Sequence, residues 1–289
     1  MQARSATRLE QMIGRLDRRI VYLGLFLFTL VPLWSKLALP LYVTDPPKLF
    51  HKTVEELPQD KLVFISSDWD AGSQAENRPQ FIALIRHLIR RNLKFAIICI
   101  AYPTSVQMAQ TAILEAIELE NAKDRCVYGR DWVNLGYKPG EEPWLRTFAA
   151  SIPAAVKEDI EGTPLEQIPV MKGVRNFGPD AQVSTMVNVT GSITAEKWYQ
   201  FLTPTKVKML IGATAVMAPE QYPYLDSGQI SGLLTGMKGA AEYEKLLGAP
   251  AHGTAMMAGQ SFAHLYILLL ILLGNLSLVV GWWQRRRLR

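Results

Sequence analysis

The sequence predicts an α/β domain built on a mainly parallel, doubly wound (Rossmann-like) sheet and placed between two transmembrane helices. Short, strongly apolar runs alternate with longer runs of helical spacing through residues 44–263, which is the pattern of βαβ units with a sheet covered on both faces. Two further apolar stretches of about twenty residues lie near the ends of the chain, each long enough to cross a bilayer. Arginines stand outside both stretches, so the ends of the chain carry the topological signal.

The first transmembrane helix is expected over residues 20–43. It opens with the apolar run IVYLGLFLFTLVPLW and follows a basic segment, residues 1–19, that holds five arginines against two acidic residues. Pro32 is expected to kink this helix, and Lys36 to extend its ammonium group towards the far interface. A cleaved signal peptide is the alternative, but no small-residue cleavage site follows the apolar run, so we expect a retained anchor.

The second transmembrane helix is expected over residues 264–283, which contain no Asp, Glu, Lys or Arg. Twenty residues at a rise of ~1.5 Å cover about 30 Å, the thickness of the hydrocarbon core. Trp282 and Trp283 stand where an aromatic belt is expected, and the basic tail 284–289 follows them. The positive-inside rule therefore places both termini in the cytoplasm, the spans in the plasma (cell) membrane and the α/β domain on the extracytoplasmic side.

Within the domain, the elements are predicted from periodicity. Continuous apolar runs rich in β-branched residues predict buried strands, and the most apolar run, KFAIICIA, is expected near the centre of the sheet. The predicted strands are 61–66, 94–101, 182–189 and 208–215, with a broken strand through 126–129 and 132–135. The predicted helices are 75–92, 104–120, 143–159 and 227–247, and the Pro- and Gly-rich segment 160–180 is expected to be a loop.

The distribution of charge excludes an electrostatic nucleic-acid footprint. The whole chain has a net charge of +5, but residues 44–263 carry 21 Lys and Arg against 24 Asp and Glu. The basic excess therefore belongs to the membrane flanks, and no nucleic-acid partner is expected. The two cysteines, Cys99 and Cys126, do not form a disulfide framework in a domain of this size.

One candidate site follows the first strand, in the stretch SSDWDAGS. An apolar strand followed by Asp-x-Asp, here Asp68 and Asp70, resembles the first motif of the haloacid dehalogenase-like phosphohydrolases. The resemblance implies a nucleophile at Asp68, a proton-transfer group at Asp70 and Mg²⁺ beside both of them. It also implies a phosphate-binding hydroxyl at Thr214 and a lysine at Lys238. No later strand ends in the acidic pair that completes the metal site of that family, and the alternative is a binding or structural loop.

The second candidate is a set of glycines and aromatic residues before and within the predicted helix 227–247. Three glycines recur every four residues and a fourth follows, and such a ridge lets another backbone approach closely. Packing on the domain's own sheet, contact with another subunit and contact with a ligand all remain open. The interface residues expected here are Gly228, Gly232, Gly236, Gly239, Tyr222 and Tyr224.

Polar residues inside the second span extend this predicted interface. Asn275 and Ser277 are able to hydrogen-bond a partner helix, which favours a homo-oligomer or a complex with other membrane subunits in the lipid bilayer. The four histidines lie far apart in the sequence without the spacing of metal ligands, so we expect neither a metal site nor a cofactor.

The segments 128–140 and 212–244 resemble a family of prokaryotic membrane proteins with two spans and an α/β domain, to which no function is attached. The resemblance implies topology alone. Together, the patterns favour a non-enzymatic, membrane-anchored scaffold subunit of a cell-envelope assembly. The alternatives are a Mg²⁺-dependent phosphohydrolase using Asp68 and Asp70, and a tethered receptor for a small molecule.

Overall fold

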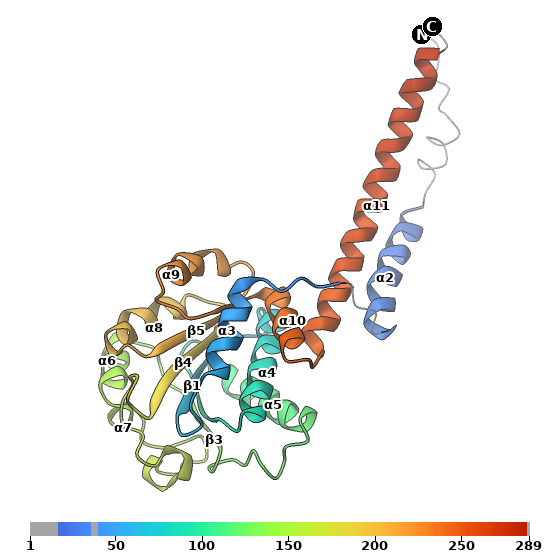
Figure 1. Cartoon of the computed structure of the whole chain (residues 1–289). Helices are drawn as coiled ribbons and strands as arrows, with labels where there is room; N and C mark the ends of the chain where they lie inside the picture. The colour runs from blue at the N-terminus through green and yellow to red at the C-terminus, as the bar shows by residue number, and fades with distance from the viewer. Residues whose placement is uncertain (1–16, 36–39, 288–289) are drawn as a thin grey trace. The chain divides into compact units, whose positions relative to one another are not determined.

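The computed structural model describes residues 17–35 and 40–287, which fall into two units (Figure 1). One unit is the α/β domain, Tyr42–Thr254. The other contains the described residues up to Leu41 and from Ala255 onward. The predicted basic segment 1–19 lies almost entirely outside the described residues, as do residues 36–39 of the predicted first span and the last two residues of the tail.

A six-stranded, wholly parallel sheet forms the centre of the domain, in the order β3-β2-β1-β4-β5-β6. The chain runs outward from β1 to β3, returns to pair β4 with β1, and continues outward to β6. The sheet therefore has its topological switch point between β1 and β4. The predicted doubly wound α/β fold is confirmed. The strands are β1 Leu62–Asp68, β2 Lys94–Cys99, β3 Trp132–Tyr137, β4 Val183–Thr190, β5 Lys208–Ala213 and β6 Leu233–Thr235.

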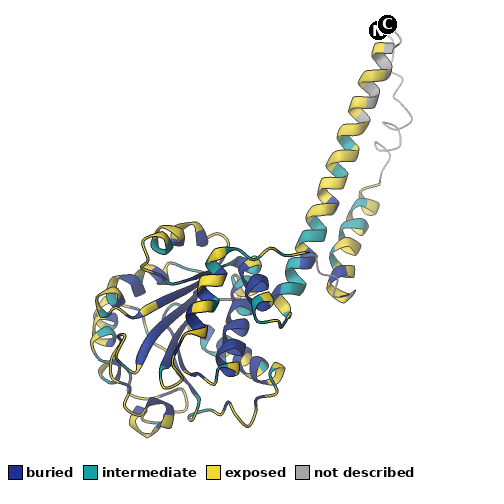
Figure 2. Ribbon diagram, in the orientation of Figure 1, coloured by how far each residue is buried: buried dark blue, intermediate teal, exposed yellow. Residues whose placement is uncertain are grey.

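Helices cover both faces of the sheet, so nearly every strand residue is buried (Figure 2). One face carries a core that includes Phe50, Trp69, Phe81 and Tyr243, and the other a core that includes Phe148 and Trp198. The first face is covered by α3 Asp45–Glu55, α4 Gln74–Arg90, α5 Ser105–Leu119 and α10 Gly236–Leu246. The second is covered by α6 Glu142–Ala150, α7 Ile152–Ala155 and α8 Thr194–Leu202, with the short helix α9 Tyr222–Asp226 beside it.

The predicted helix 227–247 is wrong in its first half. Gly228 and Gly236 adopt positive φ values of 76° and 56°, which a right-handed helix does not accommodate. The strand β6 occupies the interval between these two glycines, and α10 begins at Gly236. The four glycines therefore do not form a ridge on one helix.

Two smaller boundaries also differ from the predictions. Residues 126–129 form no strand, because Gly129 turns the chain at φ 76° and β3 begins only at Trp132. The predicted helix 143–159 divides at Ser151, whose backbone is extended, into α6 and α7. The helices α3 and α8 were not predicted.

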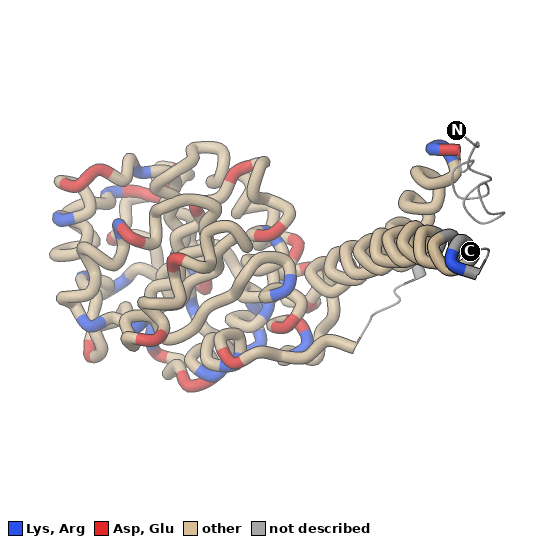
Figure 3. Tube along the Cα trace, turned by 90° about the horizontal axis from the view of Figure 1, so that it is seen from above, with Lys and Arg blue, Asp and Glu red and all other residues tan. Residues whose placement is uncertain are grey.

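In the second unit, the helix α11, His252–Arg287, contains the stretch His252–Leu276, which is long and apolar enough to cross a membrane. No Lys, Arg, Asp or Glu interrupts the sequence from His252 to Gln284, and Figure 3 shows the charge returning only at its C-terminal end. Among the described residues this is the one helix that meets both criteria. The predicted first span corresponds to α2, Arg18–Ser35, a helix of 18 residues with Pro32 inside it, which does not meet both criteria.

The helices α2 and α11 contact each other in an antiparallel sense. The Tyr266 hydroxyl donates to the Val21 carbonyl over 3.1 Å, and its ring lies 4.9 Å from the Phe28 ring. Further along, Gly259 lies against the side chain of Leu33. Early residues of α2 thus pair with later residues of α11 and late residues of α2 with earlier ones.

Candidate functional site

Asp68 ends β1 beside the switch point, where ligands bind in doubly wound sheets. Its side chain is completely buried. One carboxylate oxygen accepts from the backbone N–H groups of Ile100 and Ala101, over 2.7 and 3.1 Å. The other accepts from the Asn188 amide over 2.8 Å and from the Ser66 hydroxyl. Burial raises the pKa of Asp68 despite these hydrogen bonds.

The geometry of Asp68 does not favour a nucleophile. Both oxygens already have partners, and no part of the carboxyl group meets solvent. The carboxyl group instead joins the ends of three neighbouring strands, β2, β1 and β4, because its partners follow β2 and lie on β4. These hydrogen bonds make Asp68 a structural cross-link between the strands, which corresponds to the structural-loop alternative for this motif.

Acidic side chains of the chain itself occupy the start of α4. Asp70 accepts from the backbone N–H and the hydroxyl of Ser73, over 3.0 and 2.9 Å, and these hydrogen bonds lower its pKa. Glu76 accepts from the backbone N–H of Ala215 over 2.7 Å. A Cβ atom on Gly191 would meet Ser73 at 2.4 Å, so the loop after β4 lies tightly on the same turn. The place where a Rossmann-like fold binds phosphate is thus filled by carboxylates.

The other two residues of the phosphohydrolase resemblance lie after β5 and on α10. Thr214 is buried after β5, and its backbone N–H donates to the Thr190 carbonyl over 3.3 Å. Lys238, on α10, forms an ion pair with Glu242 four residues later. Lys238 also lines a cavity of about 220 Å³, together with Thr44, Pro46, Pro47, Tyr222, Thr235 and Glu242.

The predicted interface glycines serve the interior of the domain. A Cβ atom on Gly232 would lie 2.3 Å from the Cα atom of Phe50, so this position requires glycine for β6 to pack on α3. A Cβ atom on Gly239 would lie 2.8 Å from the backbone carbonyl carbon of Leu234. Gly228 is exposed and has open space around it. Intramolecular packing, one of the three alternatives, accounts for Gly232, Gly239 and the equally buried Gly236, and contact with another subunit remains a prediction for the set.

The remaining predicted interface residues divide between buried contacts and exposed surface. The ring of Tyr224 packs 4.4 Å from that of Tyr199, whereas Tyr222 is exposed. Asn275 is exposed on α11, and the side chain of Ser277 lies outside the described part of the chain. Tyr222 and Asn275 are therefore the exposed side chains of this prediction.

Two buried glutamates on α10 bind the points where the chain enters and leaves the domain. Glu242 accepts from the backbone N–H and the hydroxyl of Thr44, over 3.2 and 3.0 Å, just before α3 begins. Glu244 accepts from the backbone N–H groups of Ala251, Gly253 and Thr254, over 2.9, 2.8 and 2.8 Å. It also accepts from the Thr254 hydroxyl over 2.7 Å. Glu244 thereby caps the N-terminus of α11 with a negative charge.

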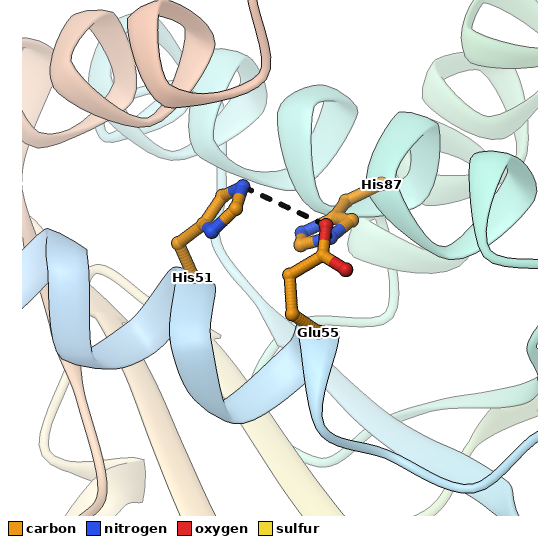
Figure 4. A group of neighbouring side chains, drawn as sticks. All are labelled: His51, Glu55 and His87. Carbon is orange, nitrogen blue, oxygen red and sulfur yellow. Dashed lines mark hydrogen bonds and ion pairs between the residues drawn. The ribbon is translucent and has the colours of Figure 1, made fainter.

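Two histidines that are far apart in the sequence come together with Glu55 where α3 lies beside α4 (Figure 4). His51 and Glu55 lie one turn apart on α3, and His87 reaches them from α4. The Nε2 atom of His87 lies 2.9 Å from Glu55 Oε1, and the Nε2 atom of His51 lies 3.9 Å from the same oxygen. The two imidazole rings stack at 4.6 Å.

Both imidazoles of this cluster are neutral at physiological pH. Burial lowers the pKa of His87 to about 4, although the carboxylate of Glu55 opposes the shift. Burial also lowers the pKa of His51. Neutral imidazoles and a carboxylate are donors that transition metals bind. The i, i+4 spacing of His51 and Glu55 is the one signal of this cluster that the sequence contains, and it depends on the helix α3.

No protein-family model, curated protein or solved structure matches the chain. The resemblances to the phosphohydrolases and to the two-span membrane family therefore remain expectations, and function has to be argued from the domain's own contacts.

Proposed function

We propose that this chain is a non-enzymatic, membrane-anchored scaffold subunit of a cell-envelope assembly. In this proposal α2 and α11 both cross the plasma membrane, both termini are cytoplasmic, and the α/β domain is extracytoplasmic. The chain associates with further copies or with other membrane subunits through the domain and the second span.

The observation that carries the proposal is the pair of glutamates on α10. Thr44 follows the first apolar segment and Thr254 precedes the second, and both are bound by carboxylates only two residues apart on one helix. These hydrogen bonds are charge-assisted and buried, so they are stronger than ordinary surface contacts. Because both ends of the domain are bound to one helix, its connections to the two apolar segments start from fixed points, which suits a structural part.

The carboxyl edge of the sheet supports the same function. Its acidic residues bind the chain's own backbone and hydroxyl groups, as Asp68 and Asp70 do, and are therefore not available as a nucleophile and a metal ligand. A general acid or base must reach the proton that it transfers in a bound substrate. Asp68 has no exposed atom with which to do so.

The apolar helices support the membrane setting. The helix α11 has the length and composition of a span, and its long apolar side chains, such as Leu268 and Leu272, are exposed. The antiparallel contact between α2 and α11 agrees with two spans whose outer ends lie on one side. The arginines at those ends then assign that side to the cytoplasm.

Topology and assembly are tested separately on the full chain. Protease added to intact cells is expected to cut the domain, and protease added to inverted vesicles is expected to spare it; the reverse pattern contradicts the extracytoplasmic placement. In mild detergent or nanodiscs, light scattering is expected to give a particle of several chains. A monomer under both conditions contradicts the scaffold.

A matched pair of substitutions tests the second span as an association surface. Asn275→Leu removes the exposed amide of α11 and is expected to reduce the particle mass. Leu276→Ala changes an exposed neighbour about 100° around the helix and is expected to leave the mass unchanged. Equal masses for wild type and both variants place the association surface outside this face of α11.

A tethered receptor for a small molecule is the second candidate, and the cavity beside β6 favours it. The cavity of about 220 Å³ lies at the carboxyl end of the strand and is lined by hydroxyl groups as well as by Lys238. Its size suits a ligand smaller than a typical drug molecule. A thermal-shift screen with small organic acids and alcohols tests this function, and a ligand that stabilises wild type but not Thr235→Trp supports it.

A further inference from the structure

We propose that His51, Glu55 and His87 form a binding site for a divalent transition-metal ion, Zn²⁺ by its donor set, with one coordination position open to solvent. The site goes beyond the scaffold function and does not depend on it. It lies within the α/β domain and joins α3, the first helix of the domain, to α4.

The distances suit tetrahedral coordination. Zinc binds imidazole nitrogen and carboxylate oxygen at about 2.0–2.2 Å, which places the ligand atoms about 3.3 Å from one another. Glu55 Oε1 lies 2.9 Å from His87 Nε2 and 3.9 Å from His51 Nε2, on either side of that value. All three ligand atoms lie within 4.8 Å of one another. Adjustments of the exposed ends of His51 and Glu55 bring the set to the required geometry.

The surroundings supply both access and orientation. The Glu55 side chain is 44% exposed and that of His51 21% exposed, so an ion and a water molecule reach the cluster from solvent. His87 is buried, and its Nδ1 atom lies 2.6 Å from the hydroxyl of Tyr243, a completely buried residue of α10. Metal-binding histidines commonly use their second nitrogen in this way. The Arg91 guanidinium lies 3.6 Å from Glu55 Oε2, the oxygen that is not assigned to the metal.

The competing interpretation is a hydrogen-bond relay without a metal. In that relay the Tyr243 hydroxyl donates to Nδ1 of His87, and Nε2–H of His87 donates to Glu55. His51 has no place in this relay, because its only contact with Glu55 is the ion-pair distance of 3.9 Å. Metal binding to Nε2 reverses the roles, so that Nδ1–H of His87 then donates to Tyr243. His51 therefore distinguishes the two interpretations.

The test uses the full chain in detergent, without a polyhistidine tag and stripped of metal with a chelator. Isothermal titration with Zn²⁺ alone is expected to show saturable binding of one ion per chain. His51→Ala is expected to weaken this binding at least about 100-fold, because it removes a direct ligand, whereas loss of an outer partner costs 10–100-fold. Without metal, His51→Ala is expected to unfold at a slightly lower temperature than wild type, because it loses the stacking on His87 but keeps the relay.

His252→Ala is the matched control. His252 is an exposed histidine that also lies beside a glutamate, with its Nε2 atom 2.6 Å from Glu115 Oε1, so it reports zinc binding by an ordinary surface pair. Zinc affinity is expected to remain unchanged in this variant. Absence of saturable binding in wild type, equal affinity in wild type and His51→Ala, or equal losses in both variants overturns the proposal.

Cobalt provides a readout of geometry. Co²⁺ in place of zinc is expected to give the visible absorption of a four- or five-coordinate ion, which is stronger than that of a six-coordinate ion. Tyr243→Phe is expected to retain the band but to weaken the affinity for zinc about 10-fold, because the hydroxyl orients His87 without touching the metal. A Co²⁺ spectrum identical to that of the free hydrated ion overturns the proposed ligand set.

Discussion

The buried carboxylates at the ends of strands and helices differ from the half-exposed carboxylate of the histidine cluster in how fully their oxygens are hydrogen-bonded. Glu244 is buried and accepts four hydrogen bonds from the start of α11. Asp68 is buried and is equally satisfied at the ends of the strands. Glu55 is instead half-exposed beside two neutral imidazoles, and the Nε2 atom of His51 comes no closer to it than 3.9 Å.

The difference shows that position in the fold does not by itself identify a site. Asp68 lies where ligands bind in doubly wound sheets, yet both of its carboxylate oxygens accept hydrogen bonds from the protein itself. The cluster around Glu55 instead lies on α3 and α4, away from the strand ends. It offers nitrogen and oxygen donors to an ion and is partly exposed to solvent. Three measurements test this contrast.

The largest effect is expected from Glu244→Ala. The substitution leaves three backbone N–H groups and one hydroxyl without their carboxylate, and each charge-assisted bond contributes more than a neutral one. Because water partly replaces the lost partner, we expect a loss of about 3 kcal/mol in the free energy of unfolding. Urea titration monitored by tryptophan fluorescence measures it in the full chain in detergent.

Glu118→Ala is the control for this measurement. Glu118 is an exposed helical glutamate of α5, so its removal is expected to change the free energy by less than about 0.5 kcal/mol. Similar stabilities for the two variants would show that the hydrogen bonds of Glu244 do not fasten the start of α11.

The open cluster is expected to make stability depend on pH. His87 has a folded-state pKa of about 4, below the value near 6.5 of an unfolded histidine, so the unfolded chain binds the proton first as the pH falls. Stability from this group is therefore complete above about pH 6.5 and declines between that pH and pH 4. His51 and Glu55 of α3, Arg91 of α4 and the Tyr243 hydroxyl are the groups that face His87.

The expected decline is about 2 kcal/mol between pH 7 and pH 5, measured by urea unfolding in the presence of a chelator. His87→Gln removes the titrating group and is expected to flatten most of this decline, even though the variant starts from a lower stability. If wild type and His87→Gln lose stability in parallel over this interval, His87 does not remain neutral in the folded protein.

The sequence was sufficient for five of the six strands, and insufficient for β6 and for the contacts at the edge of the sheet. Apolar runs such as KFAIICIA identify buried strands, because a parallel sheet covered on both faces has no polar face to interrupt them. The apolar run KLVFIS also predicted a strand that ends at residue 66, just before Asp68, whereas β1 extends to Asp68 itself. Three of its four partners, Ile100, Ala101 and Asn188, lie at least 32 residues away, so the local sequence does not reveal that both carboxylate oxygens are hydrogen-bonded.

The glycines and histidines show a second limit of prediction from the sequence. The sequence does not distinguish a glycine with a left-handed backbone from one packed inside a helix. The positive φ values of Gly228 and Gly236 show that the helix α10 does not include β6. His51 and His87 are 36 positions apart in the sequence, and they meet only because α3 and α4 cover the same face of the sheet. Proximity of this kind belongs to the tertiary structure.

The smallest effect is expected from Asp68→Asn, because two contributions oppose each other. The amide keeps an oxygen for the N–H groups of Ile100 and Ala101, but it turns an N–H₂ group towards the N–H₂ group of Asn188. Removal of a buried charge offsets part of that loss, so we expect a net loss of about 1 kcal/mol in the free energy of unfolding. The exposed Asp60→Asn is the control and is expected to leave stability unchanged.

The pH dependence of the Asp68→Asn effect separates the two contributions. Burial raises the folded-state pKa of Asp68, so the folded protein holds this proton to a higher pH than the unfolded chain does. Wild type therefore gains stability from Asp68 in acid and loses that gain as the pH rises through the folded-state pKa. The difference between wild type and Asp68→Asn is expected to be largest in acid and to shrink towards neutral pH. A difference that grows with pH would mean that the hydrogen bonds outweigh burial and that Asp68 is held as a carboxylate.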